Sequence, residues 1–168
     1  MAFTGRSIYI DAEWYIGGHI FLIGYAYSKY EFGQLYDGAL TKEQFLKKLR
    51  NVKYIFFYGP DIGIIEKYFD IDLRNRYICV NLLRIFRKVL QLTSFKLAHV
   101  EQKFGIVRKQ VEYKKNIFAI FNDWKKHDKR KRILKYNEED VINLLRLWRK
   151  VRSRNKITNY YLIQNQLK

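Results

Sequence analysis

The sequence predicts one α/β domain, a mixed sheet with three antiparallel leading strands and helices on its faces. Alternating β-branched and aromatic residues predict strands over 7–14 and 19–27, with the hairpin signal Gly17-Gly18 between them. The continuous apolar run 53–58 is typical of a central strand covered on both faces. Helical spacing dominates the second half of the chain, so layers of helices on a mixed sheet are expected.

The other elements follow in chain order. A third strand is expected over 31–37, and Thr41 is a suitable N-cap for a helix over 42–50. A helix over 62–69 and a strand over 77–80 come next. Further helices are expected over 82–90, 94–104, 116–126 and from about 131 to 151. These define one domain over 1–151, followed by a basic C-terminal extension over 152–168.

The charge balance predicts a polyanionic partner. The 168 residues include 33 Lys and Arg against 16 Asp and Glu, a formal net charge of +17. Such an excess favours nucleic acid over a membrane surface. The single cysteine, Cys79, excludes an internal disulfide. No signal-peptide pattern opens the chain and no apolar run is long enough for a membrane span, so a cytoplasmic protein is expected, in a cell or in the host of a virus or mobile element.

The few acidic residues fall at informative places. Asp11 and Glu13 are two apart on the first strand, so their side chains leave the same face. Asp61 lies just beyond the carboxyl end of the central strand, where open α/β sheets bind ligands. Simpler interpretations exist for both positions: an acidic strand end at a turn, and an acid favoured by the dipole at a helix start.

The last long helix carries an acid on its apolar face. Steps of three or four residues along it connect the following positions: Ile133, Tyr136, Asp140, Leu144, Leu147 and Val151. A carboxylate that faces a core needs a cation or a proton as partner. An interhelical ion pair would satisfy Asp140, but Tyr136 one turn earlier favours a metal site.

Together the acids predict a site for two divalent ions, Mg²⁺ or Mn²⁺, because both prefer carboxylate oxygen ligands. Two ions roughly 3.5–4 Å apart activate water and stabilise the leaving oxygen in phosphodiester cleavage. In this interpretation Asp11 bridges both ions, Glu13 and Asp140 bind one of them, and Asp61 supports the site from further out. Tyr136 orients the attacking water.

This arrangement resembles the DEDD exonucleases of the ribonuclease H-like fold, in their tyrosine branch, DEDDy. The resemblance rests on IYIDAEW, YGPDIG and YNEED, which contain Asp11 with Glu13, Asp61, and Tyr136 with Asp140. The stretch LTSFKLAHVEQKFGI also resembles the one that this family places before its final helix. The histidine branch of the family would need a histidine at position 135, which is Lys135 here. The resemblance covers about residues 7–150. It implies a metal-dependent 3′–5′ exonuclease that acts on single-stranded DNA or RNA.

Basic clusters at 84–88, 125–132 and 146–156 predict a surface that follows phosphates. The expected contacts in the middle cluster are Lys125, Lys126, Lys129, Arg130 and Arg132, and Trp14 beside Glu13 is expected to stack on unpaired bases. Two alternatives stay open. The form YGPD replaces the family's common Asn-X-X-Phe-Asp, which permits a nucleic-acid-binding module without catalysis. The same fold also supports structure-selective endonucleases.

Overall fold

The computed structural model describes residues 5–109 and 117–168, and it contains the predicted mixed sheet flanked by helices. The strands are β1 (Arg6–Tyr15), β2 (His19–Ala26), β3 (Phe32–Tyr36), β4 (Val52–Phe57) and β5 (Ile78–Asn81). Their order in the sheet is β3-β2-β1-β4-β5. The first three strands pair antiparallel, whereas β4 and β5 run parallel to β1, as a mixed α/β sheet requires.

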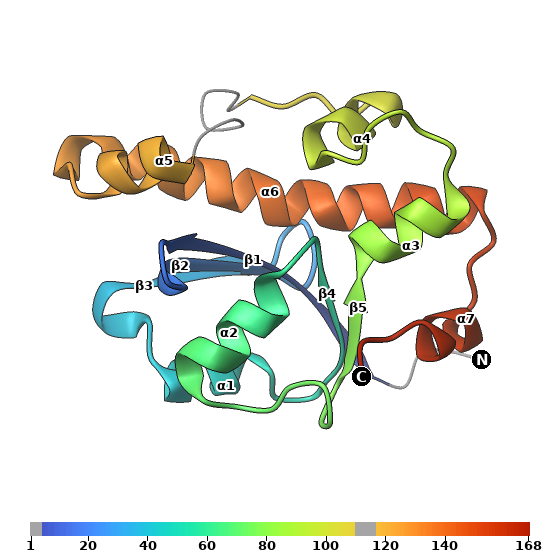
Figure 1. The fold of residues 1–168 in the computed structure, drawn as a ribbon, viewed down its shortest axis with the longest axis horizontal. Helices are drawn as coiled ribbons and strands as arrows, with labels where there is room; N and C mark the ends of the chain where they lie inside the picture. The colour runs from blue at the N-terminus through green and yellow to red at the C-terminus, as the bar shows by residue number, and fades with distance from the viewer. Residues whose placement is uncertain (1–4, 110–116) are drawn as a thin grey trace.

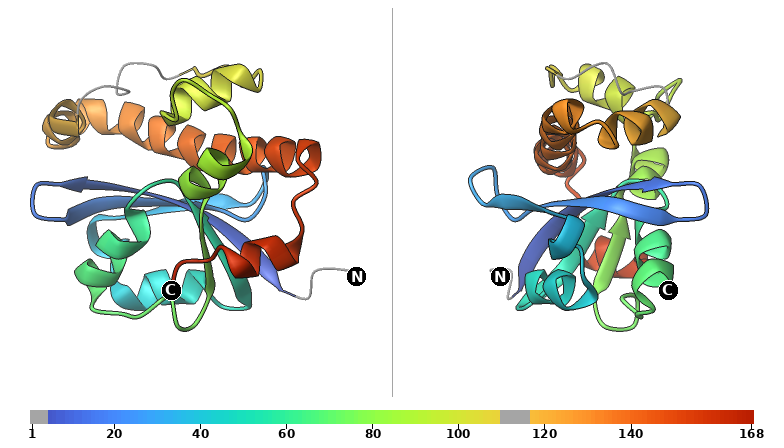
Figure 2. Two further views of the ribbon diagram at one scale, coloured as in Figure 1. Left: turned by 45° about the vertical axis from the view of Figure 1, so that its right-hand side comes forward. Right: turned by 90° about the vertical axis from the view of Figure 1, so that its left-hand side faces the viewer.

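Helices cover both faces of the sheet. They are α1 (Lys42–Lys48), α2 (Asp61–Phe69), α3 (Leu82–Val89), α4 (Leu97–Lys103), α5 (Ile117–Trp124), α6 (His127–Arg154) and α7 (Asn159–Gln164), with a 3-10 turn, η1 (Asp37–Ala39). Figure 1 shows α6 across one face of the sheet and α1 and α2 on the other, and the turned views in Figure 2 show the same two layers. The sheet therefore separates two cores.

The alternation of side chains along β1 sorts its residues between these cores. Ile8, Ile10 and Ala12 pack in the core beneath α1 and α2. Tyr9 points the other way and packs with residues of α3, α4 and α6. Residues at odd positions of β1 thus face the long helix.

Helix α6 is one continuous element of 28 residues and is longer at both ends than the 131–151 expected from the sequence. The stripe from Ile133 to Val151 is buried as predicted, Asp140 included. Residues 152–154 contain no helix breaker, so the helix continues until the chain turns at Lys156, which has a φ of 51°. No helix in the described part of the chain combines the length and the apolar character that a membrane span demands.

The segment after α6 packs on the body of the domain. Thr158 caps α7 by accepting a hydrogen bond from the Tyr161 N–H at 3.2 Å. Leu162 is fully buried in the core beneath α6. The Leu167 N–H donates to the Cys79 carbonyl at 2.9 Å, so the chain end lies along the edge strand β5. Figure 1 shows this segment beside β5.

Replacement of Leu162 tests this contact. We expect Leu162→Ala to lower the free energy of unfolding by about 2–5 kcal/mol, because it leaves a cavity in the core. Tyr160 on the same helix is 72% exposed, so Tyr160→Ala is the matched control and should change stability little. Urea unfolding of both variants measures the difference. Equal small effects would contradict the packing of α7.

Candidate metal centre

The first strand carries its two acids past the end of its parallel neighbour. β4 pairs with β1 only as far as Tyr9, opposite Phe56. Asp11 and Glu13 continue along β1, paired on the other side with Gly24 and Leu22 of β2. Because they share the parity of Tyr9, both carboxylates lie on the face covered by α6.

The end of β4 brings Asp61 to the same place. After Phe57 the chain turns at Gly59, whose φ of 102° favours glycine, and α2 begins at Asp61. Asn81 supports this turn: its side chain accepts from the Gly59 N–H at 3.1 Å and donates to the Gly59 carbonyl at 2.8 Å. Asp61 is 2% exposed, and its Oδ2 has no hydrogen-bond partner among residues 5–109 and 117–168.

Helix α6 supplies the last acid. Ligand atoms of Asp11, Glu13 and Asp140 all lie within 4.8 Å of one another. Asp140 is 5% exposed, and Tyr136 lies one turn before it on the same face. All five predicted catalytic residues line one cleft of about 860 Å³.

The pKa values of all four carboxyl groups are raised. Burial is the main cause, and it brings the pKa of Asp11 to about 7 although the neighbouring Arg108 and Asn137 lower it. Burial, followed by the charges of Asp11 and Asp140, holds the pKa of Asp61 well above its usual range. The pKa values of Glu13 and Asp140 are raised for the same reasons. A bound cation would remove this mutual repulsion.

Asp140 also has an ion-pair partner that the sequence patterns did not indicate. The Arg108 guanidinium donates through Nη2 to Asp140 Oδ1, and it makes two further bonds to Glu101, through Nε to Oε2 and through Nη2 to Oε1, the latter at 2.8 Å. Glu101 lies on α4 and is fully buried. An ion pair at Asp140 and the acid cluster therefore occur together, but Arg108 lies in the segment after α4 and not on a helix, so the pair is not the interhelical one considered from the sequence. Neither Arg108 nor Glu101 lies in a periodic stripe that could have revealed it.

A second unpredicted residue fixes Asp11. Asn137 of α6 donates through Nδ2 to Asp11 Oδ2 at 2.9 Å and to the Asp11 carbonyl at 3.3 Å. Gln34 of β3 donates to Asn137 Oδ1 at 3.0 Å, which sets the orientation of the amide. Gly24, opposite Asp11 in the sheet, leaves the necessary room, since a Cβ there would lie 2.1 Å from Asn137 Oδ1. This glycine within a strand was the available sequence signal.

The wall of the cleft opposite β1 comes from α4 and the residue before it. It includes Lys96, Ala98, His99 and Gln102, all of which lie in the stretch LTSFKLAHVEQKFGI, although the sequence analysis gave none of them a role. Trp14 lies beside Glu13 and lines the cleft as well. Polar side chains of α4 and the Trp14 ring of β1 thus line the cleft together with the carboxylates.

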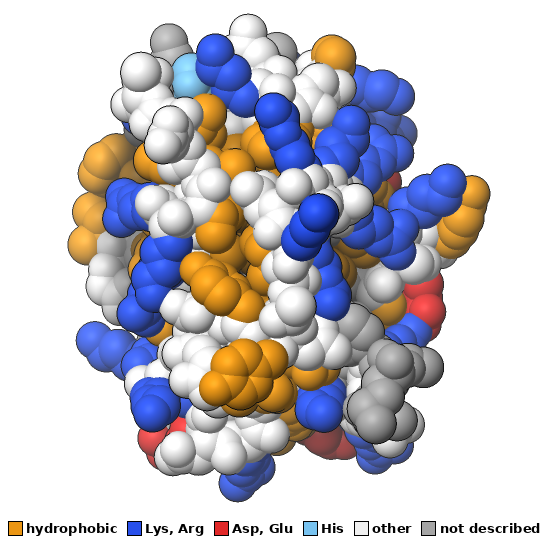
Figure 3. All heavy atoms as spheres, turned by 90° about the vertical axis from the view of Figure 1, so that its right-hand side faces the viewer, with side chains coloured by type: hydrophobic (Ala, Val, Ile, Leu, Met, Phe, Trp, Pro, Cys, Tyr) orange, Lys and Arg blue, Asp and Glu red, His pale blue; other side chains and the backbone are white. Residues whose placement is uncertain are grey.

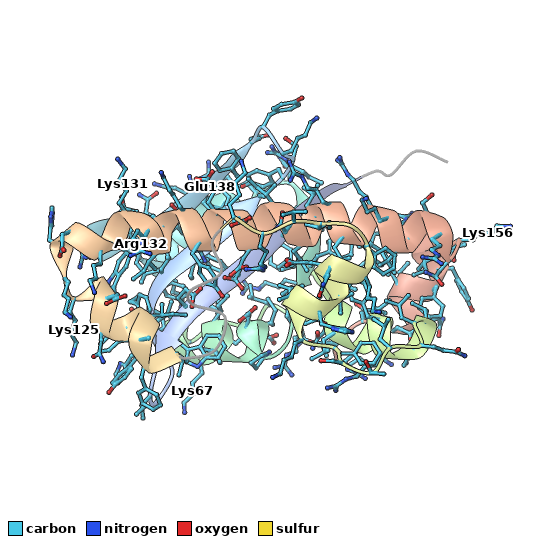
Figure 4. The ribbon with its side chains drawn as sticks, turned by 90° about the horizontal axis from the view of Figure 1, so that it is seen from above. Lys67, Lys125, Lys131, Arg132, Glu138 and Lys156 are labelled. Atoms are coloured by element: carbon cyan, nitrogen blue, oxygen red, sulfur yellow. The ribbon has the colours of Figure 1, made fainter. Side chains whose placement is uncertain are left out.

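The predicted basic contacts lie elsewhere, around the turn from α5 to α6. The residues concerned are Lys125, Lys126, Lys129, Arg130 and Arg132, and none of them lines the cleft. Three are engaged locally: Lys129 pairs with Asp123 at 3.2 Å, Arg130 pairs with Asp37 at 2.7 Å, and Lys125 lies over the Phe121 ring. Figure 4 shows Lys125 and Arg132 around the start of α6, and Lys156 beyond its other end.

The donor set suits a divalent metal ion. Asp11, Glu13 and Asp140 present closely spaced carboxylate oxygens, and the buried Oδ2 of Asp61 has no hydrogen-bond partner in the described part of the chain. Hard cations such as Mg²⁺ and Mn²⁺ prefer oxygen ligands of this kind. The four acids therefore fit the cofactor that the sequence predicts.

The mixed sheet with three antiparallel leading strands, and acids of β1 beneath a long closing helix, define a ribonuclease H-like protein. A comparison with protein families gives the same answer: residues 8–152 match RNase_H_2, a family of the RNase_H superfamily. The chain belongs to the RNase H superfamily, and the predicted fold is confirmed. No curated protein matches the sequence. Family membership and the acidic cluster indicate a nuclease that acts on nucleic acid.

The buried acids make a prediction about stability. Their pKa values are higher in the folded protein than in the unfolded chain. Between about pH 4 and pH 7 the folded protein therefore holds more protons than the unfolded chain does. Without metal, the free energy of unfolding should therefore fall as the pH rises through this window. Mn²⁺ needs the deprotonated ligands, so it should raise Tm more at pH 8 than at pH 5.

Thermal unfolding of the wild type and Asp140→Asn, in EDTA and in Mn²⁺, measures both effects. The isosteric variant removes one raised carboxyl group, so its Tm should depend less on pH and respond less to Mn²⁺. Identical pH and Mn²⁺ responses in the two proteins would contradict a metal centre at Asp140.

Proposed function

We propose that this protein is a metal-dependent nuclease that removes nucleotides from the 3′ ends of single-stranded DNA or RNA. One observation carries the proposal: carboxylates from β1 and α6 converge within 4.8 Å in a cleft of about 860 Å³. The tyrosine branch is supported by Tyr136, which lies one helical turn before Asp140 and lines that cleft.

Each residue has a distinct task in this reaction. Asp11, Glu13 and Asp140 hold Mg²⁺ or Mn²⁺, and Asp61 completes the acidic set. When bound, a pair of such ions supplies an activated water and stabilises the departing oxygen. Burial and the neighbouring carboxylates raise the pKa of the Tyr136 phenol, so it stays protonated and acts by orienting the water.

The substrate side of the cleft suits an unpaired strand. Trp14 offers an aromatic face beside Glu13, where a base freed from its stack can lie. Contacts to phosphate and to the face of a base carry little sequence information. We therefore expect digestion with weak sequence preference.

A basic hollow near the end of α6 extends this surface. It has a volume of about 580 Å³ and lies between α4 and α6, and it is lined by Lys103, Phe104, Arg149, Lys150, Ser153 and Arg154. Figure 3 shows Lys and Arg side chains gathered on this end of the molecule, with few acids among them. Arg149 follows Asp140 by nine residues, or about 14 Å along the helix axis. Nine residues also rotate the helix by about half a turn, so the connection between the two sites is along α4, where Gln102 lines the cleft and Lys103 lines the hollow.

Cleavage of labelled oligonucleotides tests the proposed reaction. A 5′-labelled single strand should be shortened from its 3′ end only with Mg²⁺ or Mn²⁺, and a circular single strand should stay intact. Asp11→Asn and Asp140→Asn should abolish cleavage, and Tyr136→Phe should lower kcat about tenfold to a hundredfold with little change in KM. Glu43→Gln on α1, far from the cleft, is the control.

The outcomes separate the alternatives. Cleavage of the circle would indicate an endonuclease. Salt-sensitive binding with no metal-dependent cleavage of single-stranded, duplex or branched substrates would indicate a binding module. Activity that survives both aspartate substitutions would refute the site.

The basic hollow makes a separate prediction about binding. Each lost phosphate contact should reduce the slope of log K against log salt by about one. We expect Arg149→Ala with Arg154→Ala to reduce the slope for a long single strand by about two while a dinucleotide is still hydrolysed normally. Lys67→Ala with Arg76→Ala, which removes two exposed cations outside the hollow, is the control. An unchanged slope would exclude the hollow as a phosphate contact.

A further inference from the structure

A buried arginine, Arg108, lines the cleft beside the carboxylates. The Arg108 side chain is 4% exposed and lines the cleft together with Asp140. Its Cζ lies 5.7 Å from the centre of the Tyr136 ring. Arg108 therefore lies among the residues to which we assign the reaction, although no sequence motif contains it.

The backbone around Arg108 is held at fixed points. The chain leaves α4 at Gly105, and the Ile106 N–H donates to the Glu101 carbonyl at 2.9 Å while Ile106 packs into the core. On the other side, the Lys109 N–H donates to Glu139 of α6 at 2.7 Å. These contacts place the guanidinium with little freedom.

The hydrogen bonds of the guanidinium leave part of it unused. A guanidinium has five N–H donors in a rigid plane. Nε and Nη2 are engaged by Glu101 and Asp140. Nη1 is buried, and no acceptor for it exists among the residues that the structure describes. An unsatisfied buried donor is costly, so an acceptor supplied by a ligand would be bound favourably.

Glu101 explains how the guanidinium is oriented. It is fully buried on α4, and its two oxygens accept from Nε and Nη2 of the same arginine. Such a bidentate pair fixes the plane of the guanidinium, which an ion pair to a single atom does not. With Nε and Nη2 held, Nη1 is the part left for another acceptor.

We propose that Arg108 is a substrate-contacting residue, whose Nη1 donates to the non-bridging oxygens of the phosphate at the carboxylate centre, with Glu101 as its positioning residue. This rests on the proposed function for the identity of the site. The phosphate must approach an acidic floor, and a guanidinium offers both positive charge and the planar donors that phosphate oxygens accept. A residue that only neutralised Asp140 would not need free donors.

Substitution of Arg108 by lysine tests the geometry, because Lys keeps the charge and loses the planar donors. We expect Arg108→Lys to bind Mn²⁺ as the wild type does, to bind thymidine 5′-monophosphate in Ca²⁺ at least tenfold more weakly, and to lower kcat about a hundredfold. The double variant Glu101→Gln with Arg108→Gln removes the charges of both residues, so that bound Mn²⁺ is left as the cation beside Asp140, and it should show the same pattern.

Arg74 provides the matched control, since it also pairs with a glutamate, Glu66, at 3.0 Å but outside the cleft. Arg74→Lys, and Glu66→Gln with Arg74→Gln, should leave all three measurements unchanged. Wild-type nucleotide binding and kcat in the Arg108 variants would overturn the proposal, as would a loss of Mn²⁺ binding as large as the loss of nucleotide binding. If the wild type cleaves nothing, the proposed function fails, and the nucleotide titration still decides whether Arg108 binds phosphate.

Discussion

Repulsion among carboxylates that share one buried cleft is the constraint on which the rest of this structure depends. Asp11, Glu13, Asp61 and Asp140 line the same cleft, where burial disfavours their charged forms. Such an arrangement is stable only with protons, hydrogen-bond donors or cations close by. The neighbouring side chains Asn137 and Arg108 meet that requirement by donating hydrogen bonds to the carboxylates.

The two donors differ in charge. Asn137 donates to Asp11 and is held by Gln34, so it orients one carboxylate without adding charge. Arg108 brings a full positive charge to Asp140, and Glu101 balances that charge from the other side. The resulting network orients two acids on different elements, while Oδ2 of the neighbouring Asp61 accepts no hydrogen bond from the residues that the structure describes. That division suits a centre that must stay ordered and still accept a cation.

The architecture separates stability from chemistry. The even positions of β1 line the core beneath α1 and α2. Of the four acids, only Asp61 belongs to an element of this core, because it is the first residue of α2. The odd positions begin in a second core at Tyr9 and end in the cleft, because β1 continues past the end of β4. One strand thus serves as a buried structural element along half its length and as a platform for ligands along the other half.

Charge on the outside complements the acids within. The basic hollow at the end of α6 lies along the same helix that provides Asp140, so the helix connects the acidic cleft to a cationic surface. An anionic polymer attracted to that surface would also meet the carboxylates of the cleft, where Lys96 and Arg108 are the Lys and Arg side chains among the described lining residues. The excess of Lys and Arg on the surface therefore does not by itself bring a phosphate to the acidic cluster.

The sequence by itself determined the class of fold and the acids of the site, because both depend on short-range periodicity. Alternation along β1 puts Asp11 and Glu13 on one face, and the stripe from Ile133 to Val151 puts Asp140 on the buried side of its helix. Only the tertiary structure decided which groups meet across elements. Arg108, Gln34 and Asn137 act through contacts between segments far apart in the chain, and no local pattern encodes such contacts. The same holds for Lys129 and Arg130, whose acidic partners follow from the packing of α5, α6 and η1.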